Sequence, residues 1–282
     1  MNLTKKSGII QGKHGKSISY DYQYNSDLDN NTLPTVIFVH GFKGYKDWGA
    51  FNLVAEYFAQ RGCFFFKFNF SHNGTDPGHP NEFVDLEAFG NNNFSIERSD
   101  LGVVIDFVES LKGELPLETK SLSLIGHSRG GADVLMKALE DDRVKKLVTW
   151  ASVLDVENFL SEELKAKLMK EQKIEIYNGR TNQYMPIYKQ FMNDLLENSD
   201  IYNLKKRLKN LWQPLLICHG TSDEAVDYVN AEKINELAPN SELFLIDDAG
   251  HTFGAKEPWE ESDLPKELAL LLEKTYHFLV KS

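Results

Sequence analysis

The fold of this chain is decided by the stretch LSLIGHSRGG at residues 122–131. The apolar run 122–125 predicts a buried strand, and residues 132–139 have the apolar spacing of a helix. Between them lies a Gly-x-Ser-x-Gly pattern centred on Ser128, which is typical of a sharp strand-to-helix turn that holds a serine hydroxyl at the end of a sheet. The backbone N–H of Arg129 would face the same space and could donate to an oxyanion.

Two further residues could complete a catalytic site. Asp223 follows the apolar run 215–218, and His251 follows the apolar run 243–246. The chain order Ser128, Asp223, His251 is the order in which one class of serine hydrolases carries its triad. All three residues follow predicted strand ends, where open α/β sheets place their sites. Asp227 is an alternative acid, but Asp223 is nearer to the end of the strand.

A further loop follows the apolar run 35–39, which predicts another buried strand. It has the sequence HGFKG at residues 40–44. With this loop the chain resembles the α/β-hydrolase superfamily from about residue 34 to the C-terminus. Five segments carry the resemblance: 40–44, 68–74, 126–131, 219–226 and 250–251. Within the superfamily the motif sequences are most similar to those of bacterial esterases related to dienelactone hydrolases, of cinnamoyl (feruloyl) esterases and of serine aminopeptidase-like hydrolases.

The resemblance implies an α/β-hydrolase fold, with a mostly parallel eight-stranded sheet that carries helices on both faces. It also implies that the Phe42 N–H is the second oxyanion donor beside the Arg129 N–H. We expect His40 to be structural. The Arg129 side chain could bind a substrate carboxylate, although a salt bridge on a helix surface is the more ordinary role for it.

The spacing of the predicted strands indicates an insertion. A strand at 144–150 is followed by the next one only at residue 215, so we expect a core domain of residues 1–152 and 214–282 with a lid of residues 153–213 after the sixth strand. The insertion should contain a helix at 161–171 and a hairpin at 173–184 that turns at Asn178-Gly179. His127 beside the nucleophile, together with lid aromatics, could line a substrate pocket; the lid candidates are Tyr177, Tyr184 and Tyr188.

Other segments add weaker expectations. Residues 7–24 predict a leading hairpin, and Asp47 is a plausible N-cap for the helix that follows it. The long loop 71–94 leaves a strand end, so we expect it to form one wall of the site. His72, Asp76 and His79 in this loop do not have firm metal-ligand spacing, so we predict no metal and no cofactor.

The net charge of the chain argues against some classes of binding partner. The formal net charge of −11 argues against nucleic acid and anionic membrane surfaces as partners. The N-terminal residues lack the apolar core of a signal peptide, and no apolar run approaches the length of a membrane span. We therefore expect a cytoplasmic protein in which Cys63 and Cys218 are reduced and buried. An oligomer is possible but is not readable from the sequence.

These patterns favour a serine hydrolase for small or aryl carboxylic esters. Ser128 would attack the carbonyl, His251 would carry the proton, and Asp223 would orient the imidazole. One alternative is an aminopeptidase-type enzyme that binds the substrate amine with acidic residues, for which the candidates are Glu82, Asp85, Glu87, Glu157, Glu162 and Glu163. Another is a binding protein without catalysis, although such proteins typically lose a triad residue and this chain keeps all three.

Overall fold

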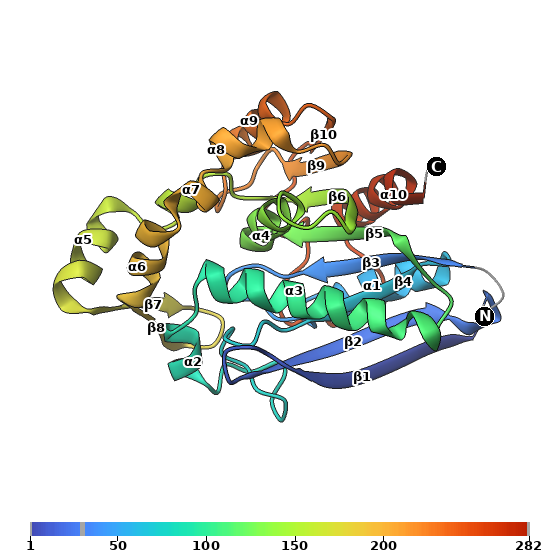
Figure 1. Cartoon of the computed structure of the whole chain (residues 1–282), viewed down its shortest axis with the longest axis horizontal. Coiled ribbons are helices and arrows are strands. Elements are labelled where there is room, and N and C mark those ends of the chain that lie inside the picture. Colours follow the sequence, from blue (N-terminus) through green and yellow to red (C-terminus); the bar gives the residue numbers. More distant parts are fainter. Residues whose placement is uncertain (1, 29–31, 281–282) are drawn as a thin grey trace.

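The computed structural model describes residues 2–28 and 32–280. A central sheet in this part of the chain consists of β1 (Leu3–Gln11), β2 (Ser17–Asn25), β3 (Leu33–Val39), β4 (Phe64–Phe68), β5 (Leu117–His127), β6 (Val144–Trp150), β9 (Leu215–Gly220) and β10 (Ser241–Ile246). Their order across the sheet is β1-β2-β4-β3-β5-β6-β9-β10 (Figure 1). β2 is antiparallel to both of its neighbours, and all other adjacent strands are parallel. The predicted mostly parallel eight-stranded sheet is confirmed.

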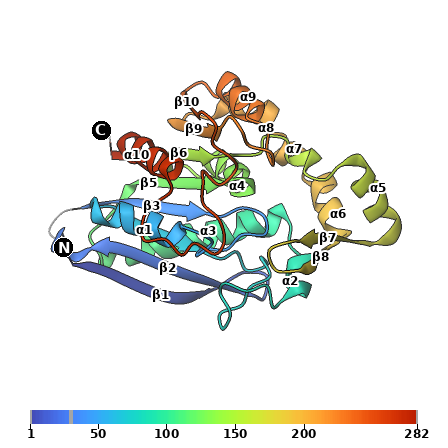
Figure 2. The same ribbon diagram turned by 180° about the vertical axis from the view of Figure 1, so that it is seen from behind.

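Helices cover both faces of the sheet (Figure 1, Figure 2). One face carries α3 (Phe94–Ser110), α4 (Arg129–Ala138) and α9 (Val229–Leu237). The opposite face carries α1 (Phe51–Gln60) and α10 (Lys266–Val280). The strands between these layers are apolar on both sides because each side packs against a helix layer.

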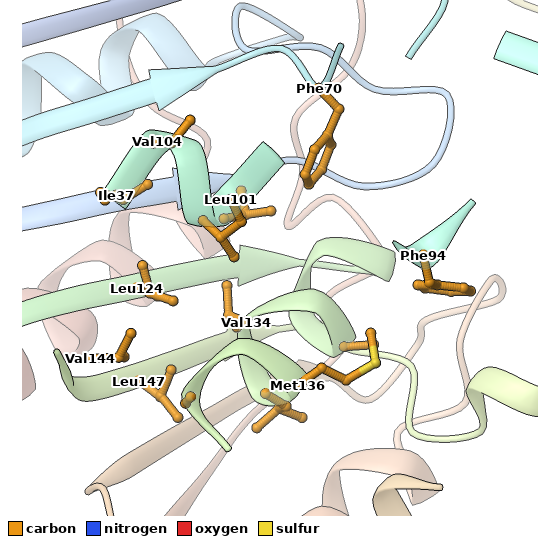
Figure 3. Packing of buried hydrophobic residues seen from close by; sticks show 14 of the residues in the cluster. Ile37, Phe70, Phe94, Leu101, Val104, Leu124, Val134, Met136, Val144 and Leu147 are labelled. Atoms are coloured by element: carbon orange, nitrogen blue, oxygen red, sulfur yellow. The ribbon is translucent and has the colours of Figure 1, made fainter. Parts of the chain in front are cut away.

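The register of the strands sorts their side chains between two cores. Ile37 and Leu124 point to the layer of α3 and α4, where they pack with apolar residues of both helices (Figure 3). The next residues along the same strands, Phe38 and Ile125, belong to the core under α1 and α10. Successive strand residues face opposite sides of a sheet, so consecutive apolar residues are needed to fill both cores.

Asp47 does not cap α1 as the sequence suggested. The N-cap position is Ala50, which makes no side-chain capping bond. The Asp47 carboxylate instead accepts hydrogen bonds from the ammonium groups of Lys46 and Lys67. Lys67 is fully buried in β4, and a buried cation is stable only with a carboxylate partner. This requirement outweighs the modest gain from capping a helix.

Residues 153–213 lie beyond the carboxyl ends of the central strands (Figure 1). The elements of this segment are η3 (Val156–Asn158), α5 (Glu162–Glu171), β7 (Lys173–Asn178), β8 (Gln183–Tyr188), α6 (Gln190–Glu197), α7 (Ser199–Tyr202), α8 (Leu204–Arg207) and η4 (Leu208–Asn210). The predicted hairpin is present, but its turn is longer than the Asn-Gly pattern indicated. Asn178 pairs with Gln183, so four residues, 179–182, make the turn.

Side chains fasten segment 153–213 to the region that begins at α2 (Leu86–Gly90). Tyr188 donates to a Glu87 carboxylate oxygen at 2.6 Å, which ties β8 to α2. The Ser95 hydroxyl at the start of α3 bonds to the Asp194 carboxylate at 2.5 Å and to the Tyr202 hydroxyl at 2.8 Å. The segment is therefore bonded to the core at several points.

Candidate active site

Ser128 lies at the turn between β5 and α4 in a strained backbone conformation. Its φ is 56° and its ψ is −120°, a region that side chains other than glycine seldom adopt. The flanking glycines make this turn possible. A Cβ at Gly126 would lie 2.2 Å from the Gly130 carbonyl oxygen, and a Cβ at Gly130 would lie 2.5 Å from the His40 carbonyl oxygen. The sharp turn that the sequence predicts at Ser128 is thus present.

Asp223 and His251 meet at the same edge of the sheet. The Nδ1 atom of His251 is 2.8 Å from Oδ2 of Asp223, although the two residues follow different strands. Oδ1 of Asp223 accepts from the backbone N–H groups of Ala225 and Val226 at 2.8 and 2.9 Å. Burial alone would raise the pKa of Asp223, but hydrogen bonds from His219, His251 and Val226 hold it well below its ordinary value. Asp223 is therefore an ionised, fixed partner for the His251 ring.

His219 is a neighbour of this pair that the sequence reasoning passed over. Its fully buried Nε2 lies 3.1 Å from Oδ2 of Asp223 and 2.8 Å from the Val226 carbonyl oxygen. The carbonyl accepts, so Nε2 carries the proton and can also donate to the carboxylate. His219 was visible in the motif HGTSDEAV at residues 219–226, but its spacing alone did not show which way its ring points.

Asp227, the alternative acid, has another role in the structure. Its carboxylate accepts from the Val229 N–H at 2.9 Å, just before α9. The ion pair to the His251 ring is made by Asp223. The geometry therefore favours Asp223 over Asp227 as the partner of the histidine.

The loop after β3 approaches Ser128 very closely. A Cβ at Gly41 would lie 2.9 Å from the Ser128 Cβ, so only glycine fits there. His40 is buried, its Nδ1 donates to the Gly41 carbonyl oxygen at 2.9 Å, and burial lowers its pKa to about 4. This neutral, fixed ring agrees with a structural role. The neighbouring Phe42 N–H and the first N–H of α4, from Arg129, remain the predicted oxyanion donors.

The Arg129 side chain is buried beneath the site and does not line it. Its Nε donates to a Glu97 carboxylate oxygen at 2.7 Å. Its guanidinium carbon is 4.0 Å from the centre of the Phe94 ring and 5.0 Å from that of Phe159. A salt bridge was one expectation for Arg129, but the pair is internal rather than on a helix surface. The guanidinium therefore fixes the start of α4 and does not reach a substrate.

A cavity of about 560 Å³ contains Ser128 and His251 together. Its walls come from the loop after β3, from the start of segment 153–213 and its hairpin turn, and from the loop after β9. The lining residues are Gly41, Phe42, Lys43, Gly44, Trp48, Phe51, His127, Ser128, Val153, Asp155, Asn158, Phe159, Arg180, Ala225, Val226, Asp227, Asn230, His251 and Thr252. This volume is that of a small-molecule site.

Several predicted pocket residues lie elsewhere. Tyr177 and Tyr184 are 49% and 63% exposed on the hairpin and contact each other, and Tyr188 bonds to Glu87. Side chains alternate along a strand: residues next to these tyrosines, such as Met185 and Ile187, are buried, and none of the three tyrosines belongs to the cavity lining. His127 does line it, and its Nε2 lies 3.0 Å from the His251 carbonyl oxygen. Burial and the nearby His251 ring lower the pKa of His127 to about 3.

Two other expectations about the cavity differ from the structure. The loop 71–94 contributes no lining residue, since part of it folds into α2 and packs against β8. The acids considered for an aminopeptidase site, Glu82, Asp85, Glu87, Glu157, Glu162 and Glu163, are likewise absent from the lining. The carboxylates that do line the cavity are Asp155 and Asp227.

The described residues offer neither a metal site nor a membrane span. Within residues 2–28 and 32–280, no group of three or more His, Cys, Asp or Glu side chains is arranged to hold a metal ion. His79 contacts Asp76 at 3.1 Å on an exposed turn, whereas the His72 ring bonds to the Ser71 hydroxyl. None of the described helices is both long enough and apolar enough to cross a membrane. Cys63 and Cys218 are buried free thiols, as predicted.

Comparisons with known proteins agree with the α/β fold. A family model described as alpha/beta hydrolase fold matches residues 34–185. Est1E from Butyrivibrio proteoclasticus, solved with ferulic acid, has a TM-score of 0.70 at 18% identity over 97% of this chain and 98% of its own. An esterase domain from Rhodothermus marinus gives 0.64 at 20% identity over 99% and 98% of the two chains. Mouse alpha/beta hydrolase domain-containing protein 10 gives 0.69 at 16% identity over 97% and 98%. No curated protein matches by sequence.

Proposed function

This chain belongs to the α/β-hydrolase fold family, and from that premise we propose that it is a serine hydrolase of small or aryl carboxylic esters. The observation that carries the proposal is the 2.8 Å contact between His251 Nδ1 and Asp223 Oδ2, in a cavity that also holds Ser128 at a strained turn. Aryl esters are included because the similar Est1E structure contains ferulic acid.

In the proposed reaction the Ser128 hydroxyl attacks the ester carbonyl and gives its proton to Nε2 of His251. Asp223 fixes the proton of the imidazole on Nδ1 and stabilises the imidazolium. The oxyanion is stabilised by the N–H groups of Phe42 and Arg129. Collapse of the intermediate expels the alcohol, which takes the proton from His251. Water then attacks the acyl-enzyme by the same route and releases the acid.

Segment 153–213 has the role of a lid in this proposal. It supplies Val153, Asp155, Asn158, Phe159 and Arg180 to the cavity wall, so it would set the shape of the substrate. The bonds from Asp194, Tyr202 and Tyr188 to the core support a fixed roof.

The test is a panel of 4-nitrophenyl esters from acetyl to octanoyl, with methyl ferulate and an aminoacyl anilide. We expect turnover of the short esters, and a fluorophosphonate should label Ser128. Ser128→Ala should abolish both turnover and labelling, while its thermal unfolding stays that of the wild type. Ser110→Ala, at an exposed position, is the matched control and should retain activity.

Two results would contradict the proposal. An inert panel combined with unlabelled Ser128 would remove the serine mechanism. Turnover of the anilide alone would replace the esterase with a peptidase.

A further inference from the structure

Two cationic side chains line the cavity without a carboxylate partner. Lys43 and Arg180 both belong to the lining. Among the described residues, neither Lys43 nor Arg180 lies within 4.0 Å of a carboxylate oxygen, whereas the other salt bridges are made by different cations. In a chain with a formal charge of −11, two unpaired cations in one small cavity require an explanation.

Arg180 is brought to the cavity by the four-residue turn between β7 and β8. One guanidinium nitrogen donates to the Lys43 carbonyl oxygen at 2.6 Å, and the guanidinium carbon lies 5.3 Å from the centre of the Trp48 ring. Guanidinium has five N–H donors, and this bond uses one of them. The remaining donors are held at the cavity wall by the ring and by the backbone.

Lys43 lies in the loop that also carries Phe42, one residue from the proposed oxyanion donor. Its ammonium is 5.9 Å from the centre of the Phe42 ring. Burial and the positive charge of Arg180 lower the pKa of Lys43. The two cations therefore repel each other, and an anion between them would relieve that repulsion.

The nearby carboxylates are already engaged. Glu257 accepts from the Gly49 N–H and from the Tyr45 hydroxyl. Asp155, in the lining, pairs with Lys205 at 2.5 Å. Asp227 alone among the lining carboxylates has no cationic partner in the described structure. Within the lining itself, Lys43 and Arg180 outnumber the unpaired Asp227, while Glu257, outside the lining, also attracts Arg180.

We propose that the cavity binds esters that carry one free carboxylate, which Arg180 and Lys43 hold while Ser128 attacks the ester. A planar guanidinium with free parallel donors matches a carboxylate. The rest of the substrate would contact Phe42, Trp48 and Phe159, which give the cavity an apolar surface. This substrate class rests on the proposed esterase function.

The first test compares ester pairs that differ only in charge. One pair is 4-nitrophenyl hydrogen adipate and 4-nitrophenyl methyl adipate, with the charge on the acyl side. The other is 4-butyryloxybenzoate and its methyl ester, with the charge on the alcohol side. We expect kcat/KM of the charged member to exceed that of the neutral member by about tenfold in one pair, the size of a charge-assisted hydrogen bond. Equal or lower kcat/KM for the charged member in both pairs would overturn the inference.

Variants at Arg180 and Lys43 show which side chain causes the preference for charged esters. Arg180→Gln should lower the charged-to-neutral ratio of kcat/KM about tenfold, and Arg180→Lys should retain part of it. Lys43→Gln should lower the ratio less. Arg207→Gln is the matched control, because Arg207 is on the same segment and also donates to a backbone carbonyl, that of Ile201, outside the cavity lining. A ratio that Arg207→Gln changes as much as Arg180→Gln would contradict the assignment.

A binding measurement separates this inference from the proposed function. Ser128→Ala is titrated by calorimetry with monomethyl adipate and with dimethyl adipate. We expect binding of the monoanion alone, and its loss when Arg180→Gln is added. Monoanion binding without turnover of any ester would sink the esterase proposal and leave the anion site. Ester turnover without monoanion binding or charge preference would sink only the anion site.

Discussion

Two fully buried carboxyl groups near Ser128, those of Asp223 and Asp133, behave in opposite ways. The pKa of Asp223 lies well below its ordinary value, and that of Asp133 lies well above it. Burial raises the pKa in both places. Asp223 receives N–H donors from two histidine rings and two backbone amides. Asp133 faces the carboxylate of Glu97, with Arg129 bonded to Glu97 rather than to Asp133. Donors therefore decide which buried acid is ionised.

The contrast assigns different tasks to the two clusters. An ionised Asp223 can stabilise a positive imidazole during a reaction. A protonated Asp133 can donate a hydrogen bond to Glu97. Glu97 and Arg129 then remain an ion pair with no net charge beneath α4. The first cluster would serve chemistry, and the second would serve the position of the helix that begins directly after Ser128.

The largest expected effect is on the ionised cluster. Asp223→Asn should lower kcat for short esters about ten-thousandfold, because a neutral amide no longer selects the useful tautomer of His251. The measurement is steady-state kinetics on 4-nitrophenyl butyrate. Asp227→Asn is the control and should lose far less. Similar losses in the two variants would erase the distinction between these acids.

The second cluster should affect folding. Arg129→Met leaves Glu97 buried without its cation, so the free energy of unfolding should fall by about 3 kcal/mol. Urea denaturation followed by circular dichroism measures this. Arg61→Met, at an exposed arginine that lies over the Tyr57 ring, should cost less than about 1 kcal/mol. If both variants lose the same stability, the buried pair has no special role.

The pH dependence of stability should distinguish Asp133 from Asp223 by the pH range in which each carboxyl contributes. A carboxyl with a raised pKa binds more protons in the folded state, so its contribution to stability falls as pH rises above about 3.8. Asp133→Asn removes this loss, and the stability of the variant relative to the wild type should rise by up to about 1.4 kcal/mol per pH unit in that window. Asp223, whose pKa is lowered, changes its protonation only below about pH 3.8, so the stability of Asp223→Asn relative to the wild type should stay constant above pH 4. Urea titrations between pH 4 and pH 8 test both, and parallel curves for the two variants would refute the contrast.

The smallest effect concerns His219, which acts through Asp223 and is thus a positioning residue. His219→Phe removes one donor from Asp223, and kcat should fall about tenfold with KM unchanged. The pKa that governs the acidic limb of the kcat profile should shift as well. His219→Gln, which keeps an N–H donor, should restore most of the rate. A loss in both variants with an unchanged pH profile would reduce His219 to a packing role.

The sequence predicted those features that depend on local pattern. The turn at Ser128 follows from two glycines at fixed spacing, and the sheet follows from apolar runs of strand length. The order of Asp223 and His251 followed from the ends of such runs. The structure brings these two residues together as the order suggested.

Features that depend on the direction of side chains could not be read in this way. Tyr177, Tyr184 and Tyr188 were plausible pocket residues, but their position in the hairpin register turns them outward. Asp47 looked like a helix cap, because the sequence does not show that Lys67 is buried beside it. The sequence did not predict Arg180 as a cavity residue, because the expected two-residue turn places it inside a strand. The four-residue turn is what brings its charge to the cavity.

The bonds between segment 153–213 and the region around α2 and α3 have a consequence for the folding pathway. Ser95 and Tyr202 are 107 residues apart in sequence, and Glu87 and Tyr188 are 101 apart. Pairing of β6 with β9 brings the two ends of the segment together, so the sheet shortens the loops that these bonds must close. We therefore expect the sheet to assemble first and the chamber above it last. A folding chain would therefore pass through a compact state that still lacks an enclosed cavity for a ligand.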